Sequence, residues 1–198
     1  MYNQINNLPP EENYQNGLLP QRNAKNFWYF DSSSRSNISK FDLSSENRRI
    51  IAKTTAYKYQ LIPLTEFKYT PQIQKTIYQW IKELDWDFPI SSVKTIFKNH
   101  IFNYLYVWRE GQNNIVAYSI CYFSQTISHI AYVFYNPKLS HGNLPIRLSL
   151  QAIIDSQQKN LDYCYLGRFN LENKLGYYKR DLPGFEYYNN NHWQTYTS

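Results

Sequence analysis

Cysteine is scarce in this chain. Only Cys121 and Cys164 occur among the 198 residues, and no CxxC pair is present. Both lie in apolar runs typical of strands, where a cysteine behaves as a small buried hydrophobe. Without a CxxC pair, zinc and iron–sulfur binding have no support in the sequence, so we expect no metal site, and we expect no disulfide either.

Long apolar segments are also missing. No apolar run reaches the length of a membrane span, and no secretory leader is recognisable at the N-terminus. We therefore expect no membrane partner and a reducing, cytoplasmic environment. The chain has no run of five like charges, although its formal net charge is +6. That balance suits a polyanion such as RNA, but an ordinary basic protein has it too.

Aromatic residues, by contrast, are abundant. They make up 18% of the chain, and 20 of them are tyrosines. A tyrosine buries its ring but needs a partner for its hydroxyl. Many of these residues should therefore lie at the edge of the core or along a groove, although a compositional bias towards tyrosine would also account for their number.

The order of predicted elements indicates an α+β fold. Residues 1–20 are polar and read as a loosely ordered segment, followed by one domain over residues 21–198. Within it we expect a strand at 26–31, a loop at 32–37, and helices from Ser44 or Ser45, over 71–86 and over 92–103. A hairpin around Gly111, a strand ending at Pro137, a helix over 148–160 and a strand over 162–169 follow. A hairpin joined to a strand–helix–strand crossover predicts a mixed sheet flanked by helices.

Several short motifs in this order resemble the aminoacyl-tRNA–protein transferases, the arginyl and bacterial leucyl enzymes. The resemblance covers roughly residues 20–198. Its matching residues are Phe41, Ser44, Asn47, Arg48, Arg49, Tyr132, Phe134, Tyr135, Asn136, Pro137, Tyr165, Leu166, Gly167, Tyr178 and Lys179. The sequence departs from the family pattern at Asn136, Arg168 and Gly176, and serines stand where the family often has cysteines.

The resemblance implies a GNAT-like fold, in which two neighbouring parallel strands splay apart and the acyl donor enters the gap. It also implies a reaction: an amino acid such as Arg or Leu passes from aminoacyl-tRNA to the N-terminal α-amine of a protein that begins with an acidic residue. This reaction tags the acceptor for degradation by the N-end rule and requires no cofactor. Because the ester is already activated, alignment of the reactants can supply much of the rate.

The candidate site residues come from the matching motifs and their neighbours. Rings would stack on the adenine at the tRNA end, cations would hold phosphate or the acceptor's carboxylate, and one glycine would allow close approach. His129 would act as a base, and Glu172 would orient the acceptor's ammonium group. The candidate catalytic residues are Tyr135, His129 and Glu172; the candidate substrate-binding residues are Arg48, Arg49, Tyr132, Tyr165, Gly167, Arg168, Tyr178 and Lys179.

Two other functions remain open. A GNAT acyltransferase could use acyl coenzyme A on an amine, but such enzymes carry a glycine-rich loop whose amides hold a pyrophosphate. Between Ser140 and Arg147 this chain has only one glycine, Gly142, and a proline that lacks a donor. A non-catalytic relative that binds peptide or RNA is the second alternative, and the departures at Asn136, Arg168 and Gly176 motivate it.

Overall fold

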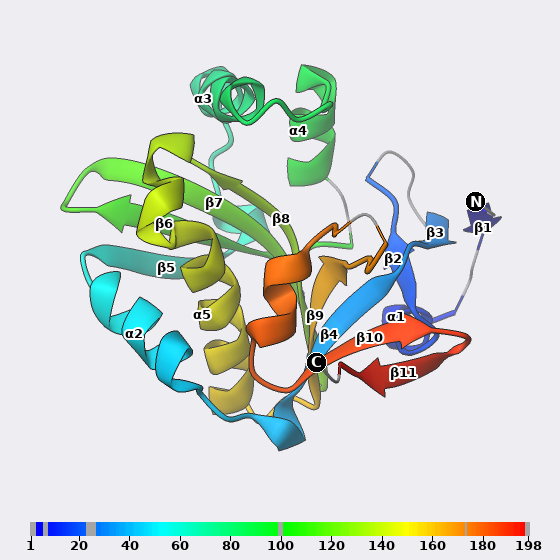
Figure 1. The fold of residues 1–198 in the computed structure, drawn as a ribbon. Coiled ribbons are helices and arrows are strands. Elements are labelled where there is room, and N and C mark those ends of the chain that lie inside the picture. Colours follow the sequence, from blue (N-terminus) through cyan, green and yellow to red (C-terminus); the bar gives the residue numbers. More distant parts are fainter. Residues whose placement is uncertain (1–2, 6–7, 23–26, 99–100, 173, 197–198) are drawn as a thin grey trace.

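The computed structural model describes residues 3–5, 8–22, 27–98, 101–172 and 174–196; the side chains of 3–5 and 140–142 lie outside the description. The largest feature is an eight-stranded sheet in the order β11-β10-β4-β9-β8-β7-β6-β5 (Figure 1). A second sheet has the order β1-β3-β2. The strands are β1 (Asn3–Ile5), β2 (Leu18–Pro20), β3 (Phe27–Phe30), β4 (Ser33–Asn37), β5 (Tyr57–Pro63), β6 (Tyr104–Glu110), β7 (Asn114–Phe123), β8 (Ile127–Tyr135), β9 (Tyr163–Arg168), β10 (Phe185–Asn189) and β11 (His192–Thr195).

Helices cover both faces of the large sheet. The α-helices are α1 (Pro10–Gln15), α2 (Ser45–Lys53), α3 (Pro71–Glu83), α4 (Ile90–Phe97) and α5 (Leu144–Gln158), and the 3-10 helices are η1 (Ile38–Lys40), η2 (Leu64–Glu66), η3 (Pro137–Gly142) and η4 (Tyr177–Asp181). In Figure 1, α3 and α4 lie above the sheet, whereas α2 and α5 lie on its other side. Strands β8 and β9 are parallel, and the other neighbours in the large sheet are antiparallel. The predicted α+β class, with a mixed sheet flanked by helices, is confirmed.

Capping residues explain why the helices begin where they do. The Ser44 hydroxyl accepts a hydrogen bond from the backbone N–H of Asn47 at 3.1 Å and caps α2. The Thr70 hydroxyl does the same for α3, and Pro71 occupies its first turn, where no N–H is needed. Apolar residues at helical spacing then turn one face of α3 towards the sheet, where Ile77 and Ile81 are buried.

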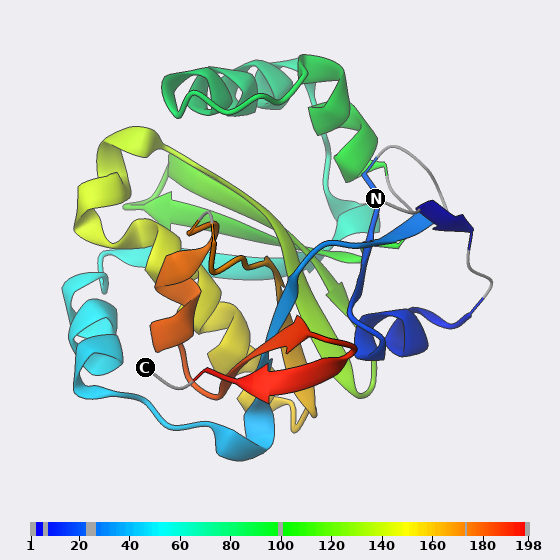
Figure 2. The same ribbon diagram turned by 45° about the vertical axis from the view of Figure 1, so that its right-hand side comes forward.

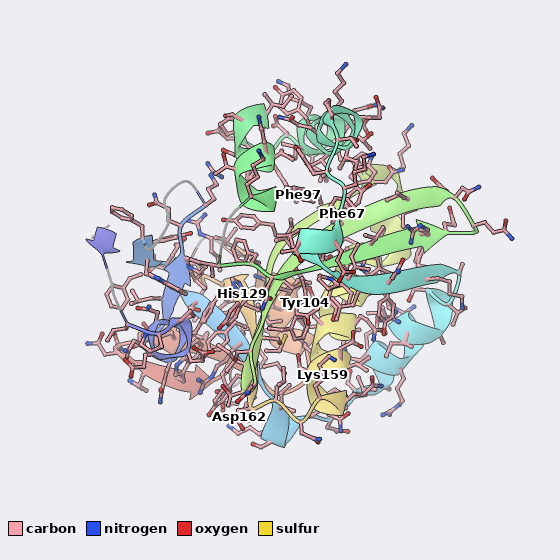
Figure 3. The ribbon with its side chains drawn as sticks, turned by 180° about the vertical axis from the view of Figure 1, so that it is seen from behind. Phe67, Phe97, Tyr104, His129, Lys159 and Asp162 are labelled. Atoms are coloured by element: carbon pink, nitrogen blue, oxygen red, sulfur yellow. The ribbon has the colours of Figure 1, made fainter. Side chains whose placement is uncertain are left out.

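Two cores lie on opposite faces of the large sheet. On one face, α3 and α4 pack on β6, β7 and β8, and the stacked rings of Phe67 and Phe97, 5.6 Å apart, lie beneath α4 (Figure 3). On the other face, α5 packs on the sheet through Leu148 and Ile153, close to Trp108 and Cys164. No helix within the described ranges has the length and hydropathy needed to cross a bilayer.

The N-terminal residues differ from the predicted loose segment. Residues 10–15 form α1, β2 follows, and Tyr14, Leu18 and Leu19 are buried together with Trp28 and Tyr165 in a third cluster. Composition predicts disorder where too little apolar surface can be buried. Here the side chains of Tyr14, Leu18 and Leu19 supply that surface, so this segment packs against Tyr165 of β9 and Ile127 of β8.

Residues 33–37, within the predicted loop, are also different. They form β4, which lies inside the large sheet between β9 and β10. Its serines at positions 33, 34 and 36 are fully buried, and two of them donate hydrogen bonds, Ser34 to the Gly167 carbonyl and Ser36 to the Pro183 carbonyl. Arg35 pairs with buried Glu186 at 2.8 Å. Small side chains, two of them with hydrogen-bonded hydroxyls, therefore allow residues 33–37 to form a buried strand that local propensity disfavours.

Candidate active site

The site begins where β8 and β9 stop pairing. Their parallel ladder comprises three residue pairs and ends at His129 and Tyr165, after which both strands continue. Strand β8 has a bulge at Ala131, where its pairing with β7 shifts by one residue, and β9 has one at Leu166, where its pairing with β4 shifts. A bulge bends the strand that carries it. Gly167 then adopts a left-handed conformation with φ of 76°, which favours glycine. The two strands consequently separate.

An open cleft of about 850 Å³ extends from this point. Rings, a few charges and backbone line it, with contributions from the segment after β2, the loop between α3 and α4, strands β8 and β9, and η4. The lining residues used below are Arg22, Tyr29, Asp85, Trp86, Asp87, Phe88, His129, Tyr132, Gly167, Arg168, Gly176, Tyr178 and Lys179. This volume is that of a small-molecule or nucleoside site.

Lys179 lies at the inner end of the cleft. Gly176, with φ of 67°, opens η4, and the backbone N–H of Lys179 donates to its carbonyl at 2.9 Å. The Lys179 ammonium or amine group donates to the Arg168 carbonyl at 2.6 Å. Burial, with the nearby Arg168 charge, lowers the pKa of Lys179 to about 7. A large fraction of this side chain is therefore a neutral amine near pH 7, and not the permanent cation expected from the sequence.

His129 lies beside Lys179 and is almost fully buried. Figure 3 marks it on β8, on the side nearest the N-terminal elements. Its Nδ1 is 2.7 Å from the Tyr14 hydroxyl, and its Nε2 has no hydrogen-bond partner among the described residues. Burial, helped by Lys179, lowers the pKa of His129 to about 3. The imidazole is therefore neutral at cellular pH and, with so low a pKa, is a poor general base, contrary to the role expected from the sequence.

Gly167 lies between the side chains of His129 and Lys179. A β-carbon at position 167 would lie 3.8 Å from His129 Nε2 and 4.0 Å from Lys179 Nζ. Because glycine has no such atom, His129 and Lys179 both face a small open volume above the backbone of β9. A reacting group placed there would meet both nitrogen atoms.

The rim of the cleft is aromatic and carries both signs of charge. Helix α3 ends in a Schellman motif, in which Asp85 is left-handed with φ of 53° and the Trp86 N–H donates to the Ile81 carbonyl. This turn places Trp86 on the rim, where it is 40% exposed. Arg168, which also lines the cleft, pairs with Asp31.

The structure brings six of the predicted site residues together in the cleft lining and leaves five outside it. The six are His129, Tyr132, Gly167, Arg168, Tyr178 and Lys179, and the five are Arg48, Arg49, Tyr135, Tyr165 and Glu172. Each of the five has a physical reason for its position.

Arg48 and Arg49 lie exposed on α2, where Arg48 donates to the Leu43 carbonyl and Arg49 pairs with Glu46. Tyr165 is buried beneath α1 and packs 4.7 Å from the Tyr14 ring.

The other two lie just beyond the cleft. Tyr135 ends β8, and its ring meets the edge of Trp86 at 6.1 Å. Glu172 is in an exposed turn, in which its backbone N–H donates to the Asn170 side chain.

Sequence reasoning missed Tyr14, Arg22 and the loop of residues 85–88. Arg22 stacks over the Phe88 ring at 4.4 Å, so the segment after β2 and the α3–α4 loop meet at the cleft. The sequence offered one signal for the loop: two aspartates alternate with aromatic rings directly after a helix. Nothing local marks Tyr14, because its role depends on a contact 115 residues away.

The start of α5 is poorly suited to hold a pyrophosphate. Asn143 precedes the helix in a left-handed conformation with φ of 62°, and Pro145 in the first turn has no N–H. A phosphate cradle needs several backbone N–H groups that converge at a helix N-terminus. The first turn therefore offers fewer donors than such a cradle uses.

No family model and no curated protein sequence matches this chain. Among solved structures, a conserved protein of unknown function from Bacteroides thetaiotaomicron is similar, with a TM-score of 0.51, 9% identity, and coverage of 84% of this chain and 58% of that one. The GCN5-related glucosamine N-acetyltransferase region of a fungal multi-domain β-N-acetylglucosaminidase is also similar. Its TM-score is 0.50 at 12% identity, and the match covers 80% of this chain and 20% of that one. L-PGS from Bacillus licheniformis has a lower TM-score of 0.47 at 13% identity, and the match covers 72% of this chain and 48% of that one.

These similarities establish the fold alone. The chain has the GNAT fold, as the resemblance implied, with β8, α5 and β9 as its strand–helix–strand crossover. The chain spans at most 58% of the length of each of these three structures.

Replacement of Gly167 tests whether its lack of a side chain opens the cleft. Both Gly167→Ala and the control Gly111→Ala add a β-carbon to a left-handed residue, which costs about 1–2 kcal/mol of unfolding free energy. A β-carbon added at position 111 would have no neighbouring atom within 4 Å, apart from those of its chain neighbours. We expect similar losses of stability in denaturant titrations, but loss of binding of an aminoacyl-adenosine analogue only in Gly167→Ala. Equal binding by both variants would contradict this location of the site.

Proposed function

We propose that the chain is an aminoacyltransferase, which passes an amino acid from the end of an aminoacyl-tRNA to the N-terminal α-amine of a protein. The observation that carries the proposal is the cleft between β8 and β9, with a buried amine of pKa about 7, Lys179, at its inner end. An amide-forming reaction needs a place where an ester and an amine meet beside a group that can accept a proton.

The character of the cleft supports a nucleoside ester as the donor. Tyr29, Tyr132 and Tyr178 line it, and a ring that stacks on a base contributes about 1–3 kcal/mol. The first turn of α5 offers few donors for a pyrophosphate. A tRNA end has no pyrophosphate to place there, so this donor fits the chain better than coenzyme A does.

The acceptor and the phosphates of the tRNA would use the charged rim. Arg168 is half exposed and pairs with Asp31, and Arg22, which also lines the cleft, lies over the Phe88 ring. A guanidinium group can hold a carboxylate or phosphate through two hydrogen bonds. An acidic first side chain of the acceptor would meet these cations, while the carboxylates of Asp85 and Asp87 favour a bound ammonium group.

The reaction balances without a cofactor. The neutral α-amine attacks the ester carbonyl carbon, and the carbonyl oxygen takes up the negative charge. Lys179, as a neutral amine, accepts the proton that the attacking nitrogen loses. The C–O bond to the ribose then breaks, the carbonyl re-forms, and Lys179 returns the proton to the departing ribose hydroxyl. An amide and an uncharged tRNA are the products.

Acyl-CoA-dependent N-acylation is the second candidate, and one observation favours it. The fungal structure with a TM-score of 0.50 is a glucosamine N-acetyltransferase region, and it shares this fold. The same cleft and the same lysine would serve that reaction. The two candidates differ in the donor, so the donor is what the first experiment must vary.

Transfer assays with different donors test the proposal directly. The chain is incubated with tRNA charged with labelled Arg, Leu or Phe and with a peptide that begins with Asp. We expect label in the peptide with at least one charged tRNA, and none when the peptide's α-amine is acetylated. No transfer with any of the three would count against the proposal. Transfer from acetyl-CoA would support the second candidate, and tRNA binding without transfer would support a non-catalytic relative.

The pH dependence of kcat/KM tests the role of Lys179. The acceptor amine has a pKa near 8, and Lys179 has a pKa of about 7. Both must be neutral, so log kcat/KM should rise with slope two below pH 7, slope one between 7 and 8, and then level. We expect Lys179→Met to lose roughly two to four decades of rate, and its log kcat/KM should rise with slope one up to pH 8 and then level. Lys159→Met, at the exposed end of α5, is the matched control and should resemble the wild type.

Stability supplies an independent check of the same pKa. Between pH 7 and 9 the unfolded chain holds a proton on this lysine and the folded chain does not. The unfolding free energy should therefore rise by about 1.36 kcal/mol per pH unit more in the wild type than in Lys179→Met. A slope that is the same in both proteins would show that Lys179 is charged in the folded state and is not the base.

A further inference from the structure

The unpaired nitrogen of His129 is the feature of the cleft that the reaction above does not use. His129 is 3% exposed, and its Nε2 has no hydrogen-bond partner among the described residues. Leaving a buried polar atom unpaired is costly, and such atoms are rare in folded proteins. Because Nε2 lies 3.8 Å from the point where a β-carbon of Gly167 would be, it borders the space beside Gly167, in the wall of the cleft that His129 and Gly167 both line.

Tyr14 determines which nitrogen of His129 carries the proton. Its hydroxyl is 2.7 Å from Nδ1, and its ring is fully buried against Trp28, Tyr122 and Tyr165. If Nδ1 donated to this hydroxyl, the hydroxyl proton would have no acceptor among the described residues. If the hydroxyl donates to Nδ1, the hydroxyl proton has an acceptor, and only the proton on Nε2 is left without a partner among the described residues. The second arrangement leaves the imidazole proton on Nε2.

The fold holds this pair in place from the N-terminal side. Tyr14 is on α1, and α1 is fixed by a hydrogen bond from the Tyr122 hydroxyl to Glu11 at 2.8 Å and by one from the Trp193 ring to the Gln15 carbonyl at 2.8 Å. The Tyr14 ring also meets the His129 ring edge-on at 5.1 Å. A donor that is fixed before the substrate arrives is what stabilisation of a developing charge requires.

We propose that His129 donates a hydrogen bond from Nε2–H to the carbonyl oxygen of the acyl ester as that oxygen becomes negatively charged, and that Tyr14 is the positioning residue that fixes this tautomer. The inference rests on the proposed function, because it assigns a role within the same cleft. With the ester carbonyl above Gly167, Nε2–H lies on one side of it and the Lys179 amine on the other.

The step leaves His129 unchanged. When the amine adds to the carbonyl carbon, the C=O electron pair moves to oxygen, and the hydrogen bond from Nε2–H stabilises that oxyanion. The oxygen re-forms the carbonyl as the C–O bond to the ribose breaks. His129 keeps its proton throughout, and proton transfer is left to Lys179.

Substitutions of His129 separate a hydrogen-bond donor from a packing residue. His129→Gln keeps an N–H near the position of Nε2, whereas His129→Leu keeps the bulk and removes the donor. We expect kcat to fall by about 10²–10³-fold in His129→Leu with little change in KM, as when one oxyanion donor is lost. His129→Gln should recover at least a tenth of the wild-type kcat. Equal kcat in the two variants would overturn the donor role.

Substitutions of tyrosine test the positioning role. Tyr14→Phe removes the hydroxyl that contacts Nδ1. Tyr122→Phe removes a hydroxyl that anchors the same helix through Glu11 and keeps the ring and backbone of Tyr122, which pairs with His129 across the sheet. We expect Tyr14→Phe to lower kcat about tenfold at unchanged KM, and Tyr122→Phe to leave kcat unchanged. Similar losses in both would mean that anchoring of α1, and not the tautomer, is what matters.

The tautomer of His129 can also be measured by NMR, without an activity assay. In protein with ¹⁵N-labelled histidine, the resonances absent from His129→Gln identify His129. We expect the proton on Nε2 in the wild type and a mixture of tautomers in Tyr14→Phe. A wild-type proton on Nδ1 overturns the inference. A wild type that transfers no amino acid from any charged tRNA overturns the proposed function, whereas an active wild type with full kcat in His129→Leu overturns this step alone.

Discussion

The early end of the parallel ladder between β8 and β9 is the constraint on which the site depends. Three residue pairs hold the strands together up to His129 and Tyr165. Beyond them, a bulge in each strand bends the backbone, and Gly167 takes a conformation that other residues avoid. The backbone groups freed from the ladder lie next to an open volume instead of a neighbouring strand. Lys179 and His129 face that volume because each is packed close to the point of separation.

The N-terminal residues complete this site. Strand β4 pairs with the outer edge of β9, so that β9 stays in the sheet after it leaves β8. Figure 2 shows β4 and β9 side by side below the α3–α4 layer, with α1 beside the strands. Buried Arg35 and Glu186 tie β4 to β10, and Tyr14 reaches His129 from α1. Residues of the large sheet and residues 19–22 and 29 thus line one cleft.

The sequence predicted the elements that have local causes. The cap at Ser44 identified α2, apolar spacing identified α3, and the motif residues Gly167 and Lys179 do lie in the cleft. The sequence did not predict features that depend on contacts between distant residues. The serines of β4 read as a loop, and Tyr14 lay in a polar segment. Arg48 and Arg49 are on α2, outside the lining of the cleft. The pKa of Lys179 also depends on burial, which one-dimensional spacing does not encode.

The most direct measurement is a crystal structure with an aminoacyl-adenosine analogue whose ester is replaced by an amide. The account predicts the analogue between β8 and β9, with its carbonyl above Gly167, within hydrogen-bond distance of His129 Nε2, and its adenine against rings of the cleft. An analogue bound elsewhere, with the space between His129 and Lys179 closed by side chains, would contradict it.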